Sequence, residues 1–298
     1  MDGDATVRMA LLQHASPGLD ASAKRANLDK CCAMIREAAR QGAQLAVTQE
    51  LFATAYFPQA EDEARFDLAE PVPGPTTQRL ATLAGELGIE IAASVFERRA
   101  AGLYHNTSVL LRPGGDVAAA PRYRKMHIPD DPRFYEKYYF TPGDLGFQVW
   151  SGAGATLGPL VCWDQWFPEA ARLTAMRGAQ VLLYPTAIGW ADAEPEAERQ
   201  AQRDAWRTVQ RAHAITNGVY VAAVNRVGRE DELTFWGSSF VADPAGRVIA
   251  EASPTNEQVL VVDCDLSRIE QTRRGWPFLR DRRIDAYEAL TRRLDDQR

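Results

Sequence analysis

Cys162 is the residue of this sequence best placed to carry out chemistry. It ends a short apolar run, 160–162, and Pro168-Glu169 then has the composition of a helix start. These signals predict a thiol on the turn between a strand and a helix, where backbone N–H groups lower the pKa of a cysteine. The alternative is an inert core residue, because unpaired cysteines commonly pack as small hydrophobic side chains.

A nucleophilic thiol needs a base or a neighbouring cation, and no histidine here lies in a cysteine-protease signature. Glu50 ends a predicted strand between apolar residues, so it is either a desolvated carboxylate that can accept the thiol proton or a solvated strand end. Lys125, in the basic run 122–129, could stabilise a thiolate or an oxyanion, or it could be a surface residue. Glu136 lies in the aromatic segment 134–140, which is typical of a pocket wall.

Alternating strand-like and helix-like segments must position these residues. Their apolar spacing predicts strands at 7–13, 45–48, 89–96, 107–111, 181–184, 219–224, 237–241, 247–251 and 258–263. It predicts helices at 27–40, 78–87, 169–177 and 199–216.

The connections between these segments indicate an α/β fold with mixed sheets. A polar turn joins 89–96 to 107–111, and Asp243-Pro244-Ala245-Gly246 is typical of a hairpin turn. Antiparallel hairpins argue against a TIM barrel, the main alternative, because its strands are all parallel. The Pro/Gly cluster 71–75 is interpreted as a loop, since the density of elements is the same on both sides. Residues 1–298 are therefore expected to form a single domain.

Composition narrows the possible partners. The 298 residues carry a formal net charge of −6, which argues against nucleic acid as the main partner. Four cysteines without metal or disulfide spacing favour a reducing cytoplasm, and no apolar run reaches the length of a membrane span. Scattered histidines and the lack of a Gly-rich phosphate loop predict neither a metal site nor a nucleotide site.

Three ordered segments, 49–52, 124–129 and 160–166, together resemble the nitrilase, or carbon–nitrogen hydrolase, superfamily. The resemblance implies a triad of Glu50, Lys125 and Cys162, with Glu136 as the second glutamate of the family. It further implies a four-layer α-β-β-α sandwich, a homo-oligomer of two or more subunits, and catalysis without a metal or organic cofactor.

Further segments are similar to those of the N-carbamoylputrescine amidase branch, namely 125–132, 139–144, 162–169, 184–189 and 278–283. This implies hydrolysis of N-carbamoylputrescine to putrescine, carbon dioxide and ammonia. Segment 152–157 departs from the branch, because relatives carry more polar residues there. The alternatives are another amidase of the superfamily, such as a β-ureidopropionase or an aliphatic amidase, and a catalytically idle binding protein on the same fold.

The expected substrate ends in an ammonium group, which requires an acid and aromatic faces. The residues expected to bind substrate are Tyr56, Trp163, Trp166, Asp130 and Trp190, with Trp163 also supplying a backbone N–H to the oxyanion. Further candidate acids are Asp131, Asp192 and Glu194. The Arg-rich end, 266–298, is expected to be a C-terminal extension that contacts other subunits.

Overall fold

Two six-stranded sheets form the centre of the protein in a computed structural model, which describes residues 6–295. In spatial order the first sheet contains β15 (Gln258–Asp265), β1 (Thr6–Gln13), β2 (Leu45–Thr48), β3 (Glu90–Ala100), β4 (Leu103–Leu111) and β5 (Arg122–Arg124). The second contains β14 (Val248–Glu251), β13 (Phe240–Ala242), β10 (Tyr220–Val224), β8 (Val181–Pro185), β7 (Ala155–Pro159) and β6 (Trp150–Gly152). A small third sheet contains β11 (Val227–Glu230), β12 (Leu233–Trp236) and β9 (Gly189–Ala191).

The alternation of side chains along β1 shows how the layers form. Val7, Met9 and Leu11 belong to a core shared with the second sheet, whereas Ala10 and Leu12 face the core beneath two helices. A strand with apolar residues on both faces must be covered on both sides.

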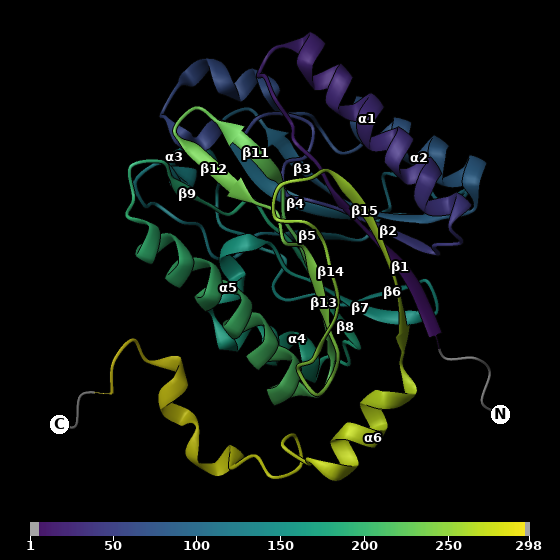
Figure 1. Ribbon diagram of the computed structural model, residues 1–298, viewed down its shortest axis with the longest axis vertical. Helices are drawn as coiled ribbons and strands as arrows, with labels where there is room; N and C mark the ends of the chain where they lie inside the picture. Colours follow the sequence, from purple (N-terminus) through teal and green to yellow (C-terminus); the bar gives the residue numbers. More distant parts are fainter. Residues whose placement is uncertain (1–5, 296–298) are drawn as a thin grey trace.

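Helices cover the outer face of each sheet, which gives the expected α-β-β-α sandwich (Figure 1). The first sheet is covered by α1 (Ala21–Arg40) and α2 (Pro75–Leu87), and the second by α4 (Pro168–Met176) and α5 (Glu196–Asn217). The prediction of an α/β fold with mixed sheets is confirmed. Antiparallel pairing of β3 with β4 and of β13 with β14 rules out the barrel alternative.

Each range predicted from apolar spacing overlaps an element of the same type, and the differences at the ends have local causes. Helix α1 begins at Ala21 instead of residue 27, because the Asp20 carboxylate caps it by accepting the N–H groups of Ser22 and Ala23. Strand β13 begins at Phe240 instead of residue 237, because residues 237 and 238 have φ values of 50° and 55°.

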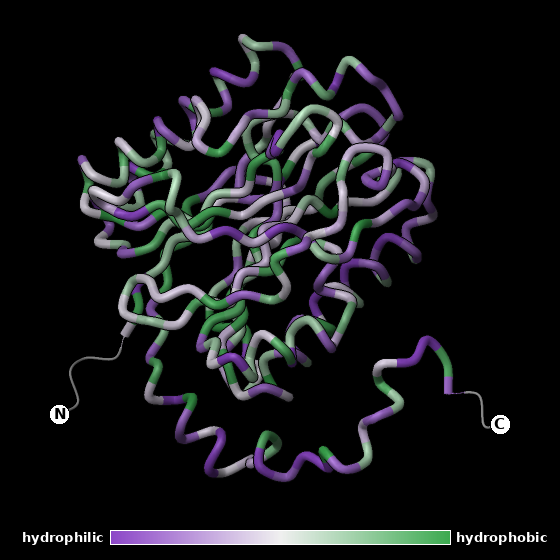
Figure 2. Tube along the Cα trace, turned by 180° about the vertical axis from the view of Figure 1, so that it is seen from behind, coloured by the Kyte–Doolittle hydropathy of each residue, from purple (hydrophilic) through white to green (hydrophobic). Residues whose placement is uncertain are grey.

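Hydrophobic residues gather on the central strands, and the end of the chain runs outside this body (Figures 1 and 2). After α6 (Ser267–Gly275), residues 276–295 extend past α4 and α5 with only short 3-10 turns. We call residues 276–295 the C-terminal arm. No helix in the described part of the chain is long and apolar enough to cross a bilayer.

His14 gives the fold a testable dependence on pH. Its imidazole is buried, and this burial lowers its pKa from 6.5 to about 4. Between these two values the unfolded chain binds a proton that the folded chain does not, so the free energy of unfolding falls as the pH drops. We expect the wild type to lose about 3 kcal/mol more than a His14→Gln variant between pH 7 and pH 4, measured by chemical denaturation. Parallel losses in the two proteins would contradict this expectation.

Candidate active site

The backbone at Cys162 makes a sharp turn. Strand β7 ends at Pro159, earlier than the apolar run suggests, and Cys162 opens a 3-10 helix, Cys162–Trp166, ahead of α4. Its φ of 41° lies in the left-handed region, which is costly for a residue with a side chain. The thiol therefore lies on the predicted turn, in a conformation that the surrounding structure must stabilise.

Asp164 stabilises this turn. Its buried carboxylate accepts hydrogen bonds from the Val161 N–H at 2.9 Å and the Tyr123 hydroxyl at 2.7 Å. The other oxygen accepts the His127 N–H at 3.1 Å and lies 2.7 Å from the His127 Nδ1. The sequence reasoning missed this role, because an Asp beside two tryptophans has no recognisable pattern for a cap that reaches residues about 40 positions away.

Glu50, Lys125 and Glu136 form a buried ionic cluster. The Lys125 Nζ donates to Glu50 Oε1 at 2.9 Å and to Glu136 Oε2 at 2.6 Å. The Tyr56 hydroxyl donates to Glu136 Oε1 at 2.7 Å. None of the three charged side chains is exposed to solvent. The structure thus brings together both predicted glutamates and the predicted lysine.

Arg226 holds the loop that carries Glu50. Leu51 has a φ of 48°, and the buried Arg226 guanidinium donates to the Glu50 carbonyl at 2.8 Å and to the Leu51 carbonyl at 3.1 Å. The same guanidinium pairs with Glu230 at 2.9 Å. Sequence reasoning also missed this residue, since Arg226 lies far from Glu50 in a loop with no distinguishing pattern.

Burial and neighbouring charges set the protonation of the site. Burial raises the pKa of the Cys162 thiol well above its usual value, the Glu50 charge raises it further, and the Lys125 ammonium lowers it. Burial opposes the charge on Lys125, but the two carboxylates outweigh it and raise the pKa of the lysine. Burial raises the pKa of Glu136 to about 7, against the effect of Lys125. The resting thiol is therefore neutral, and it must lose its proton during attack.

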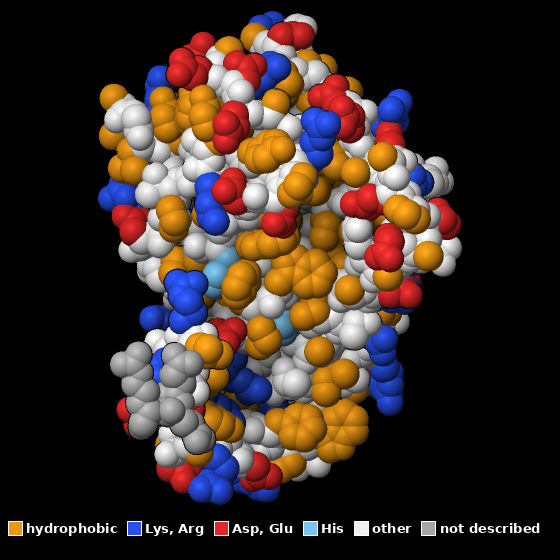
Figure 3. Space-filling model, turned by 90° about the vertical axis from the view of Figure 1, so that its left-hand side faces the viewer, with side chains coloured by type: hydrophobic (Ala, Val, Ile, Leu, Met, Phe, Trp, Pro, Cys, Tyr) orange, Lys and Arg blue, Asp and Glu red, His pale blue; other side chains and the backbone are white. Residues whose placement is uncertain are grey.

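A cavity of about 500 Å³ reaches the thiol. Its described lining includes Cys162 and the rings of Phe134, Trp163, Trp166 and Trp236. The carboxylic acids of the lining are Asp131 and Glu194. On the face in Figure 3, hydrophobic side chains gather in the middle, and acidic and basic side chains lie around them. A cavity with apolar walls and few polar groups is typical of a small-molecule site.

The other residues expected to bind substrate are dispersed. Tyr56 is buried beside Glu136, and Trp190 packs on Trp236 at a ring distance of 5.2 Å without lining the cavity. Asp130 is exposed and does not line the cavity, whereas its neighbour Asp131 does. Asp192 pairs with Arg229 at 2.5 Å. Within residues 6–295, no three His, Cys, Asp or Glu side chains form a group that could hold a metal ion.

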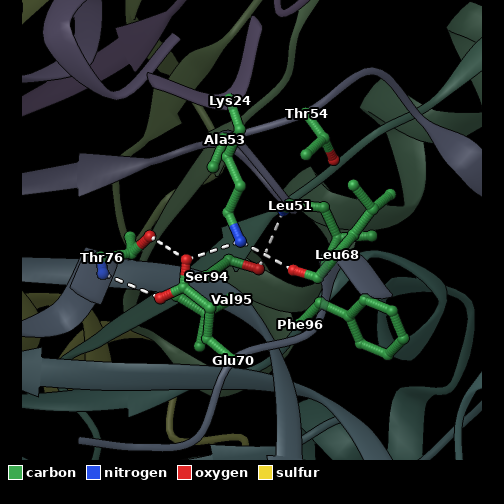
Figure 4. Close-up of a pocket in the computed structure, with 10 residues that line it drawn as sticks. All are labelled: Lys24, Leu51, Ala53, Thr54, Leu68, Glu70, Thr76, Ser94, Val95 and Phe96. Atoms are coloured by element: carbon green, nitrogen blue, oxygen red, sulfur yellow. Dashed lines mark hydrogen bonds and ion pairs between the residues drawn. The ribbon is translucent and has the colours of Figure 1, made fainter. Parts of the chain in front are cut away.

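A second cavity, of about 30 Å³, is lined by another lysine–glutamate pair, which is only partly buried (Figure 4). The Lys24 Nζ lies 2.6 Å from Glu70 and donates to the Leu68 carbonyl at 2.7 Å. Thr76 donates to Glu70 from both its N–H and its hydroxyl. No cysteine is among the described residues that line this cavity. The pair is therefore a useful structural counterpart of the cluster around Lys125.

Known proteins are similar to this chain in sequence and in fold. Residues 8–274 match the family described as carbon–nitrogen hydrolase. An N-carbamoylputrescine amidase from Solanum lycopersicum is 45% identical over 266 residues, which cover 86% of this chain and 87% of the relative. A citrullinase from Francisella tularensis is 39% identical over 272 residues, which cover 90% and 93%. The crystal structure of a carbon–nitrogen hydrolase from Helicobacter pylori has a TM-score of 0.91 at 43% identity, covering 97% of this chain and 99% of that one.

The positive charge of Lys125 should control the reactivity of Cys162. In a Lys125→Met variant the thiol loses the cation that lowers its pKa, so we expect alkylation by iodoacetamide at pH 8 to slow at least tenfold. Mass spectrometry identifies the alkylated cysteine, and circular dichroism confirms that the variant is folded.

Lys24→Met is the matched control, because it also removes a lysine paired with a glutamate. Its Cys162 should react within about twofold of the wild-type rate. Equal slowing in both variants would show that lost stability, and not the charge at the thiol, explains the effect.

Proposed function

The chain belongs to the carbon–nitrogen hydrolase family, and we propose that it hydrolyses N-carbamoylputrescine to putrescine, carbon dioxide and ammonia. It is a hydrolase of carbon–nitrogen bonds in amides. The substrate assignment is supported by the likeness to the plant amidases and by the acidic lining of the cavity that reaches Cys162.

In the first half of the reaction, Glu50 accepts the proton of the Cys162 thiol while the sulfur attacks the carbamoyl carbon. A concerted transfer suits a thiol whose pKa is raised by burial. Lys125 uses two N–H bonds on the glutamates, so its third is available for the developing oxyanion, together with the backbone N–H of Trp163. Glu136 holds Lys125 in place through its own hydrogen bond with the Lys125 Nζ at 2.6 Å.

In the second half, the carbon–nitrogen bond to putrescine breaks and Glu50 returns the proton to the departing amine. This leaves a carbamoyl thioester on Cys162. Glu50 then takes a proton from water, the hydroxyl attacks the thioester, and the thiol is restored. The carbamate that leaves decomposes to carbon dioxide and ammonia, so one water is consumed overall.

The acidic lining of the cavity is the observation that carries the choice of substrate. None of its described lining residues is Lys or Arg, while Asp131 and Glu194 both contribute. Glu194 Oε2 accepts a hydrogen bond from Gln202 Nε2 at 2.8 Å, which fixes the carboxylate and leaves its other oxygen to a ligand. Such a lining suits an ammonium end and opposes the carboxylate of citrulline or of carbamoyl-β-alanine.

Glu194 should therefore distinguish charged from neutral substrates. In Glu194→Gln we expect kcat/KM for N-carbamoylputrescine to fall about tenfold or more, mainly through KM, because a hydrogen bond to a charged group contributes about 1.5–3 kcal/mol. Steady-state release of ammonia measures both constants.

N-butylurea, which lacks the ammonium, should be turned over equally by wild type and by Glu194→Gln. Glu198→Gln is the matched control on α5, because Glu198 is exposed and does not line the cavity. An unchanged KM for N-carbamoylputrescine in Glu194→Gln would refute the proposed contact.

We also propose that the C-terminal arm packs against a second copy of the chain. Ile284, Leu290 and Leu294 are 75%, 62% and 73% exposed, although they lie on an arm with defined turns. On the adjacent α4, Leu173 and Met176 are also exposed, and Arg282 of the arm contacts the Met176 sulfur at 3.0 Å. Exposed apolar residues on both the arm and α4 form a surface suited to a subunit interface. The family match ends at residue 274, just before this arm.

Substitution within the arm should reduce assembly without unfolding the body. We expect the double variant Ile284→Asp with Leu290→Asp to have a smaller mass in sedimentation equilibrium than the wild type, because charges are costly in an apolar interface. Arg274→Ala, on the exposed face of α6, should leave the mass unchanged. Equal masses for the wild type and the double variant would refute this interface.

A further inference from the structure

We propose that Asn106 is a positioning residue that reserves one oxygen of Glu50, Oε2, for proton transfer. The inference rests on the proposed function only in taking Glu50 as the base and Cys162 as the nucleophile. In this proposal one oxygen of the Glu50 carboxylate binds Lys125, and the other exchanges protons.

The two oxygens of Glu50 have different surroundings. Oε1 accepts hydrogen bonds from Asn106 Nδ2 at 2.7 Å and from Lys125 Nζ at 2.9 Å. Oε2 is buried and has no hydrogen-bond partner among the described residues. A buried carboxylate oxygen without a donor is costly, so Oε2 is the oxygen suited to take the proton that the reaction supplies.

The two oxygens of Glu136 do not differ in this way. One of its oxygens accepts the Tyr56 hydroxyl and the other accepts Lys125 Nζ, so both oxygens have strong donors. Burial raises the pKa of Tyr56 well above its usual value, which keeps that hydroxyl a donor. Of the two glutamates that bind Lys125, only Glu50 therefore has an oxygen without a donor in the described structure.

Asn106 is well placed to impose this division. It lies on β4 and is 1% exposed, and its carbonyl accepts the backbone N–H of Lys125 at 2.9 Å. One residue thus contacts the lysine through its backbone and the base through its side chain. The atom facing Glu50 must be the amide NH₂, because a carboxylate only accepts hydrogen bonds. Asn106 does not line the cavity, so it has no contact there with substrate.

The hydrogen bond from Asn106 ends on the carboxylate that takes the thiol proton, so its removal should leave a signature in the pH profile of Cys162. The other groups that act on Glu50 are Lys125, Glu136, Tyr56 and Cys162, and Arg226 binds its backbone carbonyl. All of them remain when Asn106 alone is replaced. A shift in the profile can therefore be assigned to the lost amide.

The test is the rate of Cys162 alkylation by iodoacetamide in the full-length protein from pH 5 to pH 10. On the acidic side this rate should rise with pH, because the thiol must lose its proton in order to react. In Asn106→Leu we expect the midpoint of that rise to move up by about one pH unit. A purely structural role would lower the rate equally at every pH and leave the midpoint in place.

Two further variants keep the test decisive. Asn106→Ser, whose hydroxyl is too short to reach Glu50, should shift the midpoint in the same direction and replaces Asn106→Leu if that protein does not fold. Asn217→Leu is the matched control, because Asn217 is a buried amide that donates to the His213 carbonyl and contacts none of the groups around Glu50.

A folded Asn106 variant whose midpoint stays within about 0.3 pH unit of the wild-type value overturns the proposal, whatever its maximal rate. Alkylation does not involve N-carbamoylputrescine, so an error in the substrate leaves this result unaffected. In a Glu50→Gln variant the rise in alkylation rate on the acidic side should disappear. If the rise persists in that variant, Glu50 is not the base.

Discussion

The site depends on one interaction, the pairing of the Lys125 ammonium group with two carboxylates where no solvent reaches. Lys125 contacts both Glu50 and Glu136, and all three side chains are fully buried. A buried charge without a partner is far less stable than a paired one, so removing Lys125 would leave two buried carboxylates without a counter-charge. The cluster also acts on the nucleophile, because its charges shift the pKa of the neutral Cys162 thiol.

The backbone is arranged to hold these groups in conformations that a free chain would avoid. Leu51 and Cys162 both have positive φ values, and each lies next to a reactive group or carries one. Buried side chains oppose the strain. Arg226, from a distant segment, binds the carbonyls of Glu50 and Leu51, and Asp164, two residues after Cys162, binds the N–H of Val161. Strained residues at a functional site persist when the surrounding structure determines their conformation in this way.

The sequence was informative where a signal is local. Apolar periodicity located the long strands and the helices α1, α2, α4 and α5, but not α3 (Glu136–Tyr139) or α6. Residue type with motif order identified Glu50, Lys125, Glu136 and Cys162 as candidate site residues. The short strands β5, β6, β7, β9, β11 and β12 were missed, because three to five residues are too few to establish a period. The roles of Asp164, Arg226 and Asn106 depend on contacts between segments distant in sequence, which no local pattern contains. Asp130 was preferred to Asp131 for the same reason, since only the folded chain shows which of two adjacent acids faces the cavity.

Asp164 has a consequence for how such a protein can diversify. It accepts hydrogen bonds from Tyr123 and His127, two residues on either side of Lys125, and it lies two residues after Cys162. The segments that carry Cys162 and Lys125 are thereby both connected to the Asp164 carboxylate, and they should move together. The walls contributed by Glu194 and Trp236 belong to other segments. Mutations in these segments can therefore adapt the cavity to other amides during evolution, while Cys162 and Lys125 keep their relative position.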